Sequence, residues 1–148
     1  MVPPEAAIAA LVGHAFPGGT YRIAHWENFL LTEATGSAPL PEGLAHPAHL
    51  FHVPIAGAGT TIAELFELAQ AGSDSSVTID YYDWEYFAPL REDVAYTARG
   101  GITEHARRPA GEAGAVVDSL TYRIELFDEA GTRAARASFR WHFWRLEA

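Results

Sequence analysis

The chain has 148 residues, the length of one ordinary domain, and 49% of them are hydrophobic while 20% are charged. These values describe a soluble globular protein and exclude a disordered or fibrous chain. The net charge of −9 argues against nucleic-acid binding, because a protein that neutralises phosphates needs a basic surface.

Two residue types are missing from the sequence, which contains no cysteine and no lysine. A disulfide, a thiolate metal site and Schiff-base chemistry on a lysine are therefore impossible. No apolar run approaches the ~20 residues needed to cross a bilayer, so no membrane association is expected. The first residues lack the basic stretch of a signal peptide, and we expect a cytoplasmic protein.

The first part of the chain predicts short helices separated by turns. Helices are expected over residues 4–12 and 26–34, because apolar residues recur at helical spacing and a glycine follows each segment. Residues 21–23 suit a brief strand. The segment 37–47 is rich in proline and must form a loop.

An apolar stripe predicts a third helix, buried on at least one side. Thr60 can cap this helix, the stripe runs from Ile62 to Ala69, and Gly72 ends it. We expect the stripe to lie on the concave side of a sheet built from the residues that follow.

After Gly72 the apolar residues alternate with polar ones, which is the pattern of strands. Strands are expected at residues 77–82, 94–102, 120–127 and 135–143. Residues 128–131 suit a hairpin loop, in which Gly131 can take a positive φ, and Arg107 and Arg108 are expected in a loop.

These elements predict an α+β fold in which a curved antiparallel sheet wraps around a long central helix. One face of the sheet is apolar and must be covered, and the helix over residues 62–69 is the apolar element free to cover it. This arrangement is a hot-dog fold. No linker or internal repeat interrupts the chain, so we expect one domain spanning residues 1–148.

Four segments follow one another along the chain: LVGHAFP at 11–17, ATG at 34–36, GTTIA at 59–63 and FAPLRED at 87–93. In this order they resemble the MaoC-like family of (R)-specific enoyl-CoA hydratases and dehydratases, from about residue 11 to residue 144. The resemblance implies a hot-dog fold and a ligand that is an acyl thioester, on coenzyme A or on a carrier protein.

The loop after residues 34–36 departs from the family motif. In the family, this loop carries an Asp and a His that activate water and supply the proton, the two roles that hydration of an enoyl thioester requires. Here Ser37 stands in the Asp position and Pro41 in the His position. The resemblance therefore implies the non-catalytic type of hot dog, which supports a catalytic neighbour.

His46, His49 and His52 recur every three residues and are candidates for relocated acid–base chemistry. We single out His49 and His46 as candidate catalytic residues. The alternatives are a metal site and a structural role, and a structural role is favoured over metal because helical metal pairs are usually four residues apart with a carboxylate nearby. No metal and no cofactor are expected.

Three further side chains are candidates for binding or catalysis. Glu64 is the central-helix carboxylate that a self-sufficient hot-dog thioesterase would use. Arg136 and Arg140 lie on one face of the last strand and are candidate contacts to the phosphates of a thioester ligand. Their alternative role is pairing with acids across the sheet.

The sequence thus leaves three functional hypotheses. The leading one is a hydratase or dehydratase subunit that works with a partner hot-dog subunit. The second is a self-sufficient hydro-lyase or acyl-CoA thioesterase, and the third is a non-enzymatic acyl-ligand-binding or scaffold protein. A single hot-dog sheet exposes an edge strand, so a homodimer or a heterodimer with a second hot-dog subunit is expected.

Overall fold

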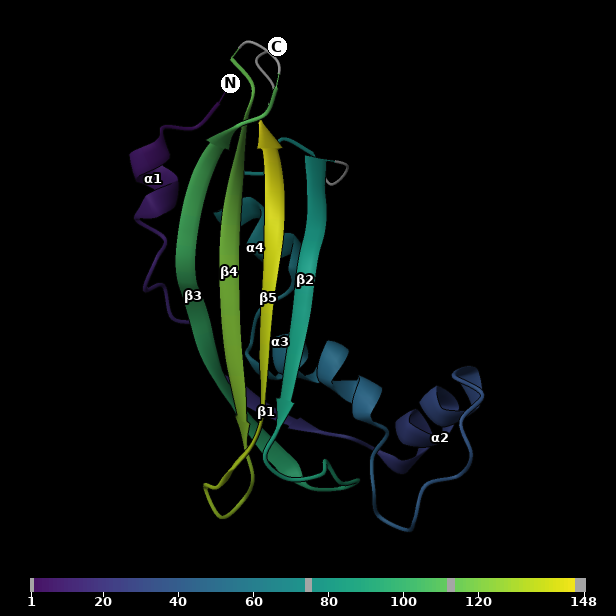
Figure 1. Ribbon diagram of the computed structural model, residues 1–148. Helices are drawn as coiled ribbons and strands as arrows, with labels where there is room; N and C mark the ends of the chain where they lie inside the picture. The colour runs from purple at the N-terminus through teal and green to yellow at the C-terminus, as the bar shows by residue number, and fades with distance from the viewer. Residues whose placement is uncertain (1, 74–75, 112–113, 146–148) are drawn as a thin grey trace.

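The computed structural model describes residues 2–73, 76–111 and 114–145 (Figure 1). Its centre is a sheet in the order β1-β3-β4-β5-β2, and every neighbouring pair in that order is antiparallel. The strands are β1 (Gly19–Arg22), β2 (Val77–Tyr86), β3 (Ala95–Pro109), β4 (Val116–Phe127) and β5 (Arg133–Arg145).

The helices are α1 (Glu5–Ala9), α2 (His25–Ala34), the 3₁₀ helix η1 (Pro47–Phe51), α3 (Val53–Gly57) and α4 (Ile62–Leu68). Figure 1 shows α3 and α4 against one face of the sheet, which we call the inner face, and α1 beside β3. In the same view α2 projects away from the sheet near the lower end of β2.

The apolar stripe of α4 packs on the inner face of the sheet. Leu65 and Ala69 are buried in the core, and the ring of Phe66 meets Trp141 edge-on at 5.5 Å and Phe143 at 6.3 Å between centroids. The predicted packing of this stripe against the C-terminal strands is confirmed, and with it the α+β hot-dog fold.

The central helical segment differs from the expected long helix, because it is divided into η1, α3 and α4. Pro47 and Pro54 stand in the first turns of η1 and α3, where the missing N–H is tolerated. Gly59 has φ +73°, and Thr61 then caps α4 by accepting a hydrogen bond from the N–H of Glu64. At each of these turns the series of helical backbone hydrogen bonds is interrupted, and a new helix begins after it.

β3 is longer than its apolar pattern indicates. Arg107 and Arg108 lie in this strand, so their predicted place in a loop is wrong. The physical reason is Asp118 of β4, which is fully buried and accepts hydrogen bonds from Arg107 Nε and Nη2, both at 2.8 Å. This pairing lets a charged segment continue the sheet.

Asp118 is also the centre of a buried cluster that ties three parts of the chain together. His105 and Arg145 bind its carboxylate at 2.9 Å and 3.0 Å. Arg145 donates to the carbonyl of Ala69 at 2.6 Å, and Arg107 donates to the carbonyl of Pro3 at 3.0 Å. The cluster therefore fixes the end of α4 and the N-terminal segment to the sheet.

Helix α2 buries its polar side and exposes its apolar side. Asn28 and Thr32 are 5% and 7% exposed, whereas Trp26, Phe29 and Leu30 are 64%, 55% and 55% exposed. The apolar stripe of a helix is normally buried, whereas the described residues leave this one more than half exposed.

Among the described residues, no helix has both the length and the apolar character needed to span a membrane.

Candidate functional site

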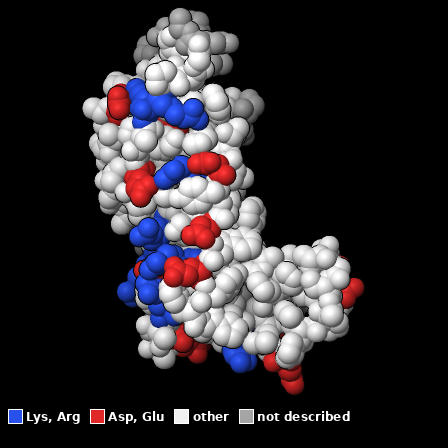
Figure 2. Space-filling view, in the orientation of Figure 1, with Lys and Arg blue, Asp and Glu red and all other residues white. Residues whose placement is uncertain are grey.

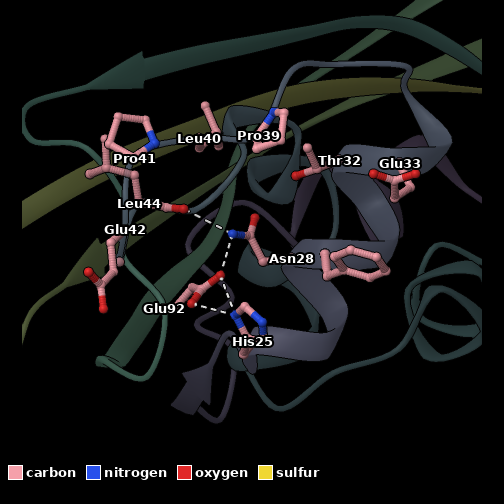
Figure 3. A pocket seen from close by; sticks show the side chains of 12 residues that line it. His25, Asn28, Thr32, Glu33, Pro39, Leu40, Pro41, Glu42, Leu44 and Glu92 are labelled. Carbon is pink, nitrogen blue, oxygen red and sulfur yellow. Dashed lines mark hydrogen bonds and ion pairs between the residues drawn. The ribbon is translucent and has the colours of Figure 1, made fainter.

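A pocket of about 280 Å³ lies between α2 and the loop over residues 39–44 (Figure 3). Phe29, Pro39, Leu40 and Leu44 give it apolar walls, and Pro41 also lines it. Polar side chains of α2 and of the turn before β3 complete the lining. The loop singled out by the sequence thus forms one wall of an open pocket.

Asn28 holds this cavity together from the buried side of α2. Its Nδ2 donates to the carbonyl of Leu44 at 2.9 Å and to Glu92 Oε1 at 2.6 Å. Its Oδ1 accepts a hydrogen bond of 2.7 Å from the N–H of His46. One side chain therefore connects the helix, the proline-rich loop and the turn before β3, as Figure 3 shows for the residues it labels.

Glu92 and His25 form a carboxylate–imidazole pair at the edge of the pocket. His25 Nδ1 lies 3.0 Å from Glu92 Oε2, and the Nε2 of His25 has no hydrogen-bond partner in the described parts of the chain. The hydrogen bond to Glu92 and its charge raise the pKa of His25, and hydrogen bonds from Asn28 and His25 lower the pKa of Glu92. A carboxylate that orients an imidazole in this way prepares its other nitrogen for proton transfer.

Replacing Glu92 by Gln is expected to lower the pKa of His25 toward its usual value of 6.5, because the charge that favours the imidazolium is removed. While Glu92 is ionised, the raised pKa means that the pair stabilises the fold fully below pH 6.5 and loses that contribution as the pH rises through the pKa of His25 in the folded state. An NMR titration of the His25 ring measures the shift.

The matched control is Glu33→Gln, a second carboxylate of the same pocket. It should leave the His25 titration unchanged. An unchanged titration in Glu92→Gln as well would show that the pair does not form in solution.

His46 has a structural position. It caps η1, and its Nδ1 accepts a hydrogen bond of 3.1 Å from the N–H of Ala48. The neutral ring therefore carries its proton on Nε2, which lies 3.1 Å from Ser37 Oγ and 3.3 Å from Thr35 Oγ1. In this state His46 donates to Ser37 and cannot take a proton from it.

His49 is buried, at 1% exposure, and neither of its ring nitrogens has a hydrogen-bond partner in the described structure. Burial, helped by the neighbouring His52, lowers the pKa of His49 to about 4, so the ring is neutral at physiological pH. The two rings stand 5.2 Å apart. A buried imidazole without hydrogen-bond partners costs free energy, and His49 is not among the residues that line the pocket beside α2.

Next to these rings, Tyr21 of β1 donates a short hydrogen bond to Glu27 of α2. Burial and this bond raise the pKa of Tyr21 to about 12. Burial alone would raise the pKa of Glu27, but the bonds from Tyr21 and from the backbone N–H of Ala24 lower it. Glu27 thus fixes the start of α2, and His52 packs edge-on against Tyr21 at 6.0 Å.

Glu64 lies at the start of α4 and is exposed. The N–H of Thr61 donates to its Oε2 at 2.8 Å, and Thr60 Oγ1 lies at 3.3 Å. Its carboxylate completes a capping box and is not among the residues that line the pocket beside α2.

Arg136 and Arg140 lie on the outer face of the sheet, opposite α3 and α4. Arg136 binds Glu85 and Glu125, each at 3.0 Å, and Arg140 binds Glu104 at 2.9 Å. Figure 2 shows arginines and acids interspersed over this face. Neither arginine lines the pocket beside α2, and both already have carboxylate partners.

Sequence reasoning missed three residues of this site: His25, Asn28 and Glu92. A signal for Asn28 was present, because it is a polar residue inside the apolar helix 26–34. Glu92 belongs to the acidic turn that resembles the family. No local signal pairs Glu92 with His25, since 67 residues separate them.

A metal centre has no support in the parts of the chain that the structure describes. No group of three or more His, Cys, Asp or Glu side chains there is arranged to hold an ion.

No protein-family model matches the chain, and no curated protein matches its sequence. Solved structures do match. The ChsH1–ChsH2 complex of Mycobacterium tuberculosis is 13% identical with a TM-score of 0.70, covering 97% of this chain and 92% of that one. C-terminally truncated HadBC, a 3R-hydroxyacyl-ACP dehydratase complex of the same organism, is 10% identical with a TM-score of 0.68, covering 89% and 96%.

A MaoC-like dehydratase is 18% identical with a TM-score of 0.63, and the match covers 92% of this chain but 43% of that one. At such identities the likeness is one of fold. The resemblance seen in the sequence is thereby confirmed at the level of the fold: the chain has the hot-dog fold of MaoC-like dehydratase structures.

Proposed function

We propose that this chain is a subunit of a MaoC-like acyl-thioester hydratase or dehydratase and that the catalytic Asp and His come from a second hot-dog subunit. The observation that carries the proposal is the pair of substitutions in the active loop, Ser37 and Pro41. The loop keeps a pocket but has lost the groups that perform hydration.

Hydration of an enoyl thioester needs a base that takes a proton from water as its oxygen attacks the β-carbon, and an acid that protonates the α-carbon. Pro41 has no side-chain proton. Ser37 Oγ lies 2.9 Å from Thr35 Oγ1 and accepts from His46, so no base activates it. Neither residue fills either role.

The exposed apolar side of α2 supports the need for a partner subunit. Trp26, Phe29 and Leu30 are each more than half exposed, and Phe29 also lines the pocket. A partner that covers this helix would close the pocket from the side. Two of the structurally similar proteins are complexes by name, ChsH1–ChsH2 and HadBC.

The ligand that we propose is an acyl thioester on coenzyme A or on a carrier protein. HadBC is named as a dehydratase of hydroxyacyl chains on a carrier protein, which supports this class of ligand.

The phosphate contacts of Arg136 and Arg140 stay predictions. So do a single domain over residues 1–148 and the cytoplasm as the compartment.

A hydration assay tests the proposal. The purified chain is mixed with crotonyl-CoA and the ultraviolet absorbance of the conjugated thioester is followed. We expect no rate above buffer for the chain alone, and hydration only when a hot-dog subunit with an intact Asp and His is added. Robust hydration by the chain alone, unaffected by His49→Ala, would contradict the proposal.

A second candidate is a self-sufficient hydro-lyase, favoured by the His25–Glu92 pair beside the pocket. In that reaction His25 would move the proton and Glu92 would orient the ring. Hydration by the chain alone that disappears in both His25→Gln and Glu92→Gln would select this candidate.

The thioesterase hypothesis rests on Glu64. Glu64→Gln tests this hypothesis without disturbing the helix. Glutamine also serves in a capping box, so α4 stays capped while the carboxylate is removed. Thioester hydrolysis that survives this change would exclude the Glu64 mechanism. A protein that neither hydrates nor hydrolyses, alone or with a partner, would fit the non-enzymatic ligand-binding or scaffold hypothesis.

A further inference from the structure

A second pocket, of about 370 Å³, lies on the outer face of the sheet. Four neighbouring strands, β3, β4, β5 and β2, supply its lining, and all the lining residues except Ala106 have polar side chains. It shares no residue with the pocket beside α2. The proposed function therefore makes no use of this group of side chains.

Ser119, His142 and Asp80 form a connected row in this pocket. The register of β4 and β5 places Ser119 opposite His142, and Ser119 Oγ lies 2.9 Å from His142 Nδ1. Asp80 Oδ2 lies 3.6 Å from the other ring nitrogen, Nε2. The charge of this carboxylate favours a proton on Nε2, so Nδ1 accepts the hydrogen of the Ser119 hydroxyl. A serine, a base and a carboxylate that orients the base are the parts of a nucleophilic triad.

The surroundings of Ser119 suit a reaction at its hydroxyl. Ser119 is 8% exposed and lines the pocket, and its neighbour on β3 is Ala106, whose small side chain leaves room beside it. Arg108 is two residues further along β3 and lies on the same face. It is exposed, lines the pocket and has no ion pair in the described stretches of the chain. A guanidinium without a carboxylate partner is able to stabilise negative charge on a carbonyl oxygen.

The other charged groups of the pocket already bind one another. Arg140 Nε donates to Thr121 Oγ1 at 2.9 Å, and Arg140 Nη2 binds Glu104 at 2.9 Å. The alternative for Ser119 and His142 is an ordinary cross-strand hydrogen bond of the same kind. That alternative predicts a serine that does not react.

We propose that Ser119, His142 and Asp80 form a second, hydrolytic site that takes small carboxylic esters. Ser119 Oγ attacks the carbonyl carbon while His142 Nδ1 takes its proton, and the electron pair of the C=O double bond moves to the carbonyl oxygen beside Arg108. When the carbonyl forms again, the bond to the alcohol oxygen breaks and His142 returns the proton to that oxygen. Water then attacks the acyl-serine in the same way, which releases the carboxylic acid and restores Ser119.

An active ester, p-nitrophenyl acetate, serves as the probe. We expect a burst of p-nitrophenolate equal to the chain concentration, followed by slower turnover, and an acetyl group on Ser119 in a peptide map by mass spectrometry. Ser119→Ala should abolish both signals. His142→Gln should lower the rate of acetylation about a hundredfold, because the base that takes the proton is lost.

Ser138→Ala is the matched control. Ser138 also lies on the outer face, in β5, but the register sets it opposite Arg123 and Asp83 and opposite no histidine. This variant should react as the wild type does.

Asp80 is a positioning residue, because it acts through His142. Asp80→Asn should slow the acetylation, and Asp80→Glu, which keeps a carboxylate, should restore most of the rate. Circular dichroism checks that each variant is folded.

Release of p-nitrophenolate that is unchanged in Ser119→Ala, or a peptide map without acetyl on Ser119, would overturn the inference. Equal rates in the wild type and His142→Gln would also overturn it. The outcome is independent of the proposed function, because hydration of crotonyl-CoA forms no acyl-serine, and either test fails or succeeds without the other.

Discussion

Replacing Asp118 by Asn is expected to lower the free energy of unfolding by about 3–5 kcal/mol, as is usual when one partner of a buried ion pair is removed. The side chain of Asp118 is 0% exposed and those of Arg107 and Arg145 are 13% and 3% exposed. Without the carboxylate, two guanidinium groups stay buried with no negative charge between them. Urea unfolding followed by circular dichroism measures the loss.

The matched control is Glu129→Gln, which breaks an ion pair with Arg22 at the surface. Both side chains are more than half exposed, and the separation is 3.6 Å. Such pairs contribute about 0–1 kcal/mol. Equal losses in Asp118→Asn and Glu129→Gln would show that the buried cluster does not hold the fold together.

The same cluster predicts a dependence of stability on pH. Burial alone would raise the pKa of Asp118, but hydrogen bonds from Arg107, His105 and Arg145 lower it to about 2, from a usual value of 3.8. A lowered pKa means that this carboxylate stabilises the fold fully above pH 3.8 and loses its contribution as the pH falls through about 2. The difference between wild type and Asp118→Asn should therefore shrink across that range.

Asn28→Ala is expected to cost about 3 kcal/mol of unfolding free energy and to open the candidate pocket. Asn28 makes three hydrogen bonds, to the carbonyl of Leu44, to Glu92 and from the N–H of His46. An alanine leaves these groups without that partner, and a buried polar group left unpaired costs about 1–3 kcal/mol. Urea unfolding measures the cost.

Thr32→Val is the control for Asn28→Ala. Thr32 is buried one turn further along α2, and its hydroxyl makes no hydrogen bond in the described structure. The change keeps the shape and should cost less than about 1 kcal/mol. If the unfolding free energies of the two variants fell together, the role assigned to the Asn28 amide would be wrong.

Asn28→Ala also has a functional readout. Because Asn28 holds the proline-rich loop against α2, its loss should weaken hydration by the complex with a partner hot-dog subunit.

Local sequence patterns predicted most of the helices and strands of the fold. The alternation at residues 120–127 and 135–143 placed β4 and β5, and the stripe from Ile62 to Ala69 placed α4 against them. Both patterns indicate which side chains are buried. Residues on one face recur at every second position of a strand and about every 3.6 positions of a helix. Gly131, with φ +77°, closes the predicted hairpin.

The apolar periodicity did not predict which face of α2 is buried. Residues 26–34 form the predicted helix, but Asn28 and Thr32 face the protein and Trp26 and Phe29 face solvent. A helical pattern defines a face and does not say what covers that face. The extension of β3 through Arg107 was hidden for a related reason, because its charge is neutralised by Asp118 on another strand.

The sequence by itself determined the hot-dog architecture and the proline-rich loop, because these are properties of local pattern and residue type. That Ser37 and Pro41 stand where the related motif carries Asp and His stays a prediction. Only the tertiary structure decided that Glu92 meets His25 and that Asn28 holds the pocket. Contacts between residues far apart in the chain depend on how strands and helices come together, and no local pattern contains that information.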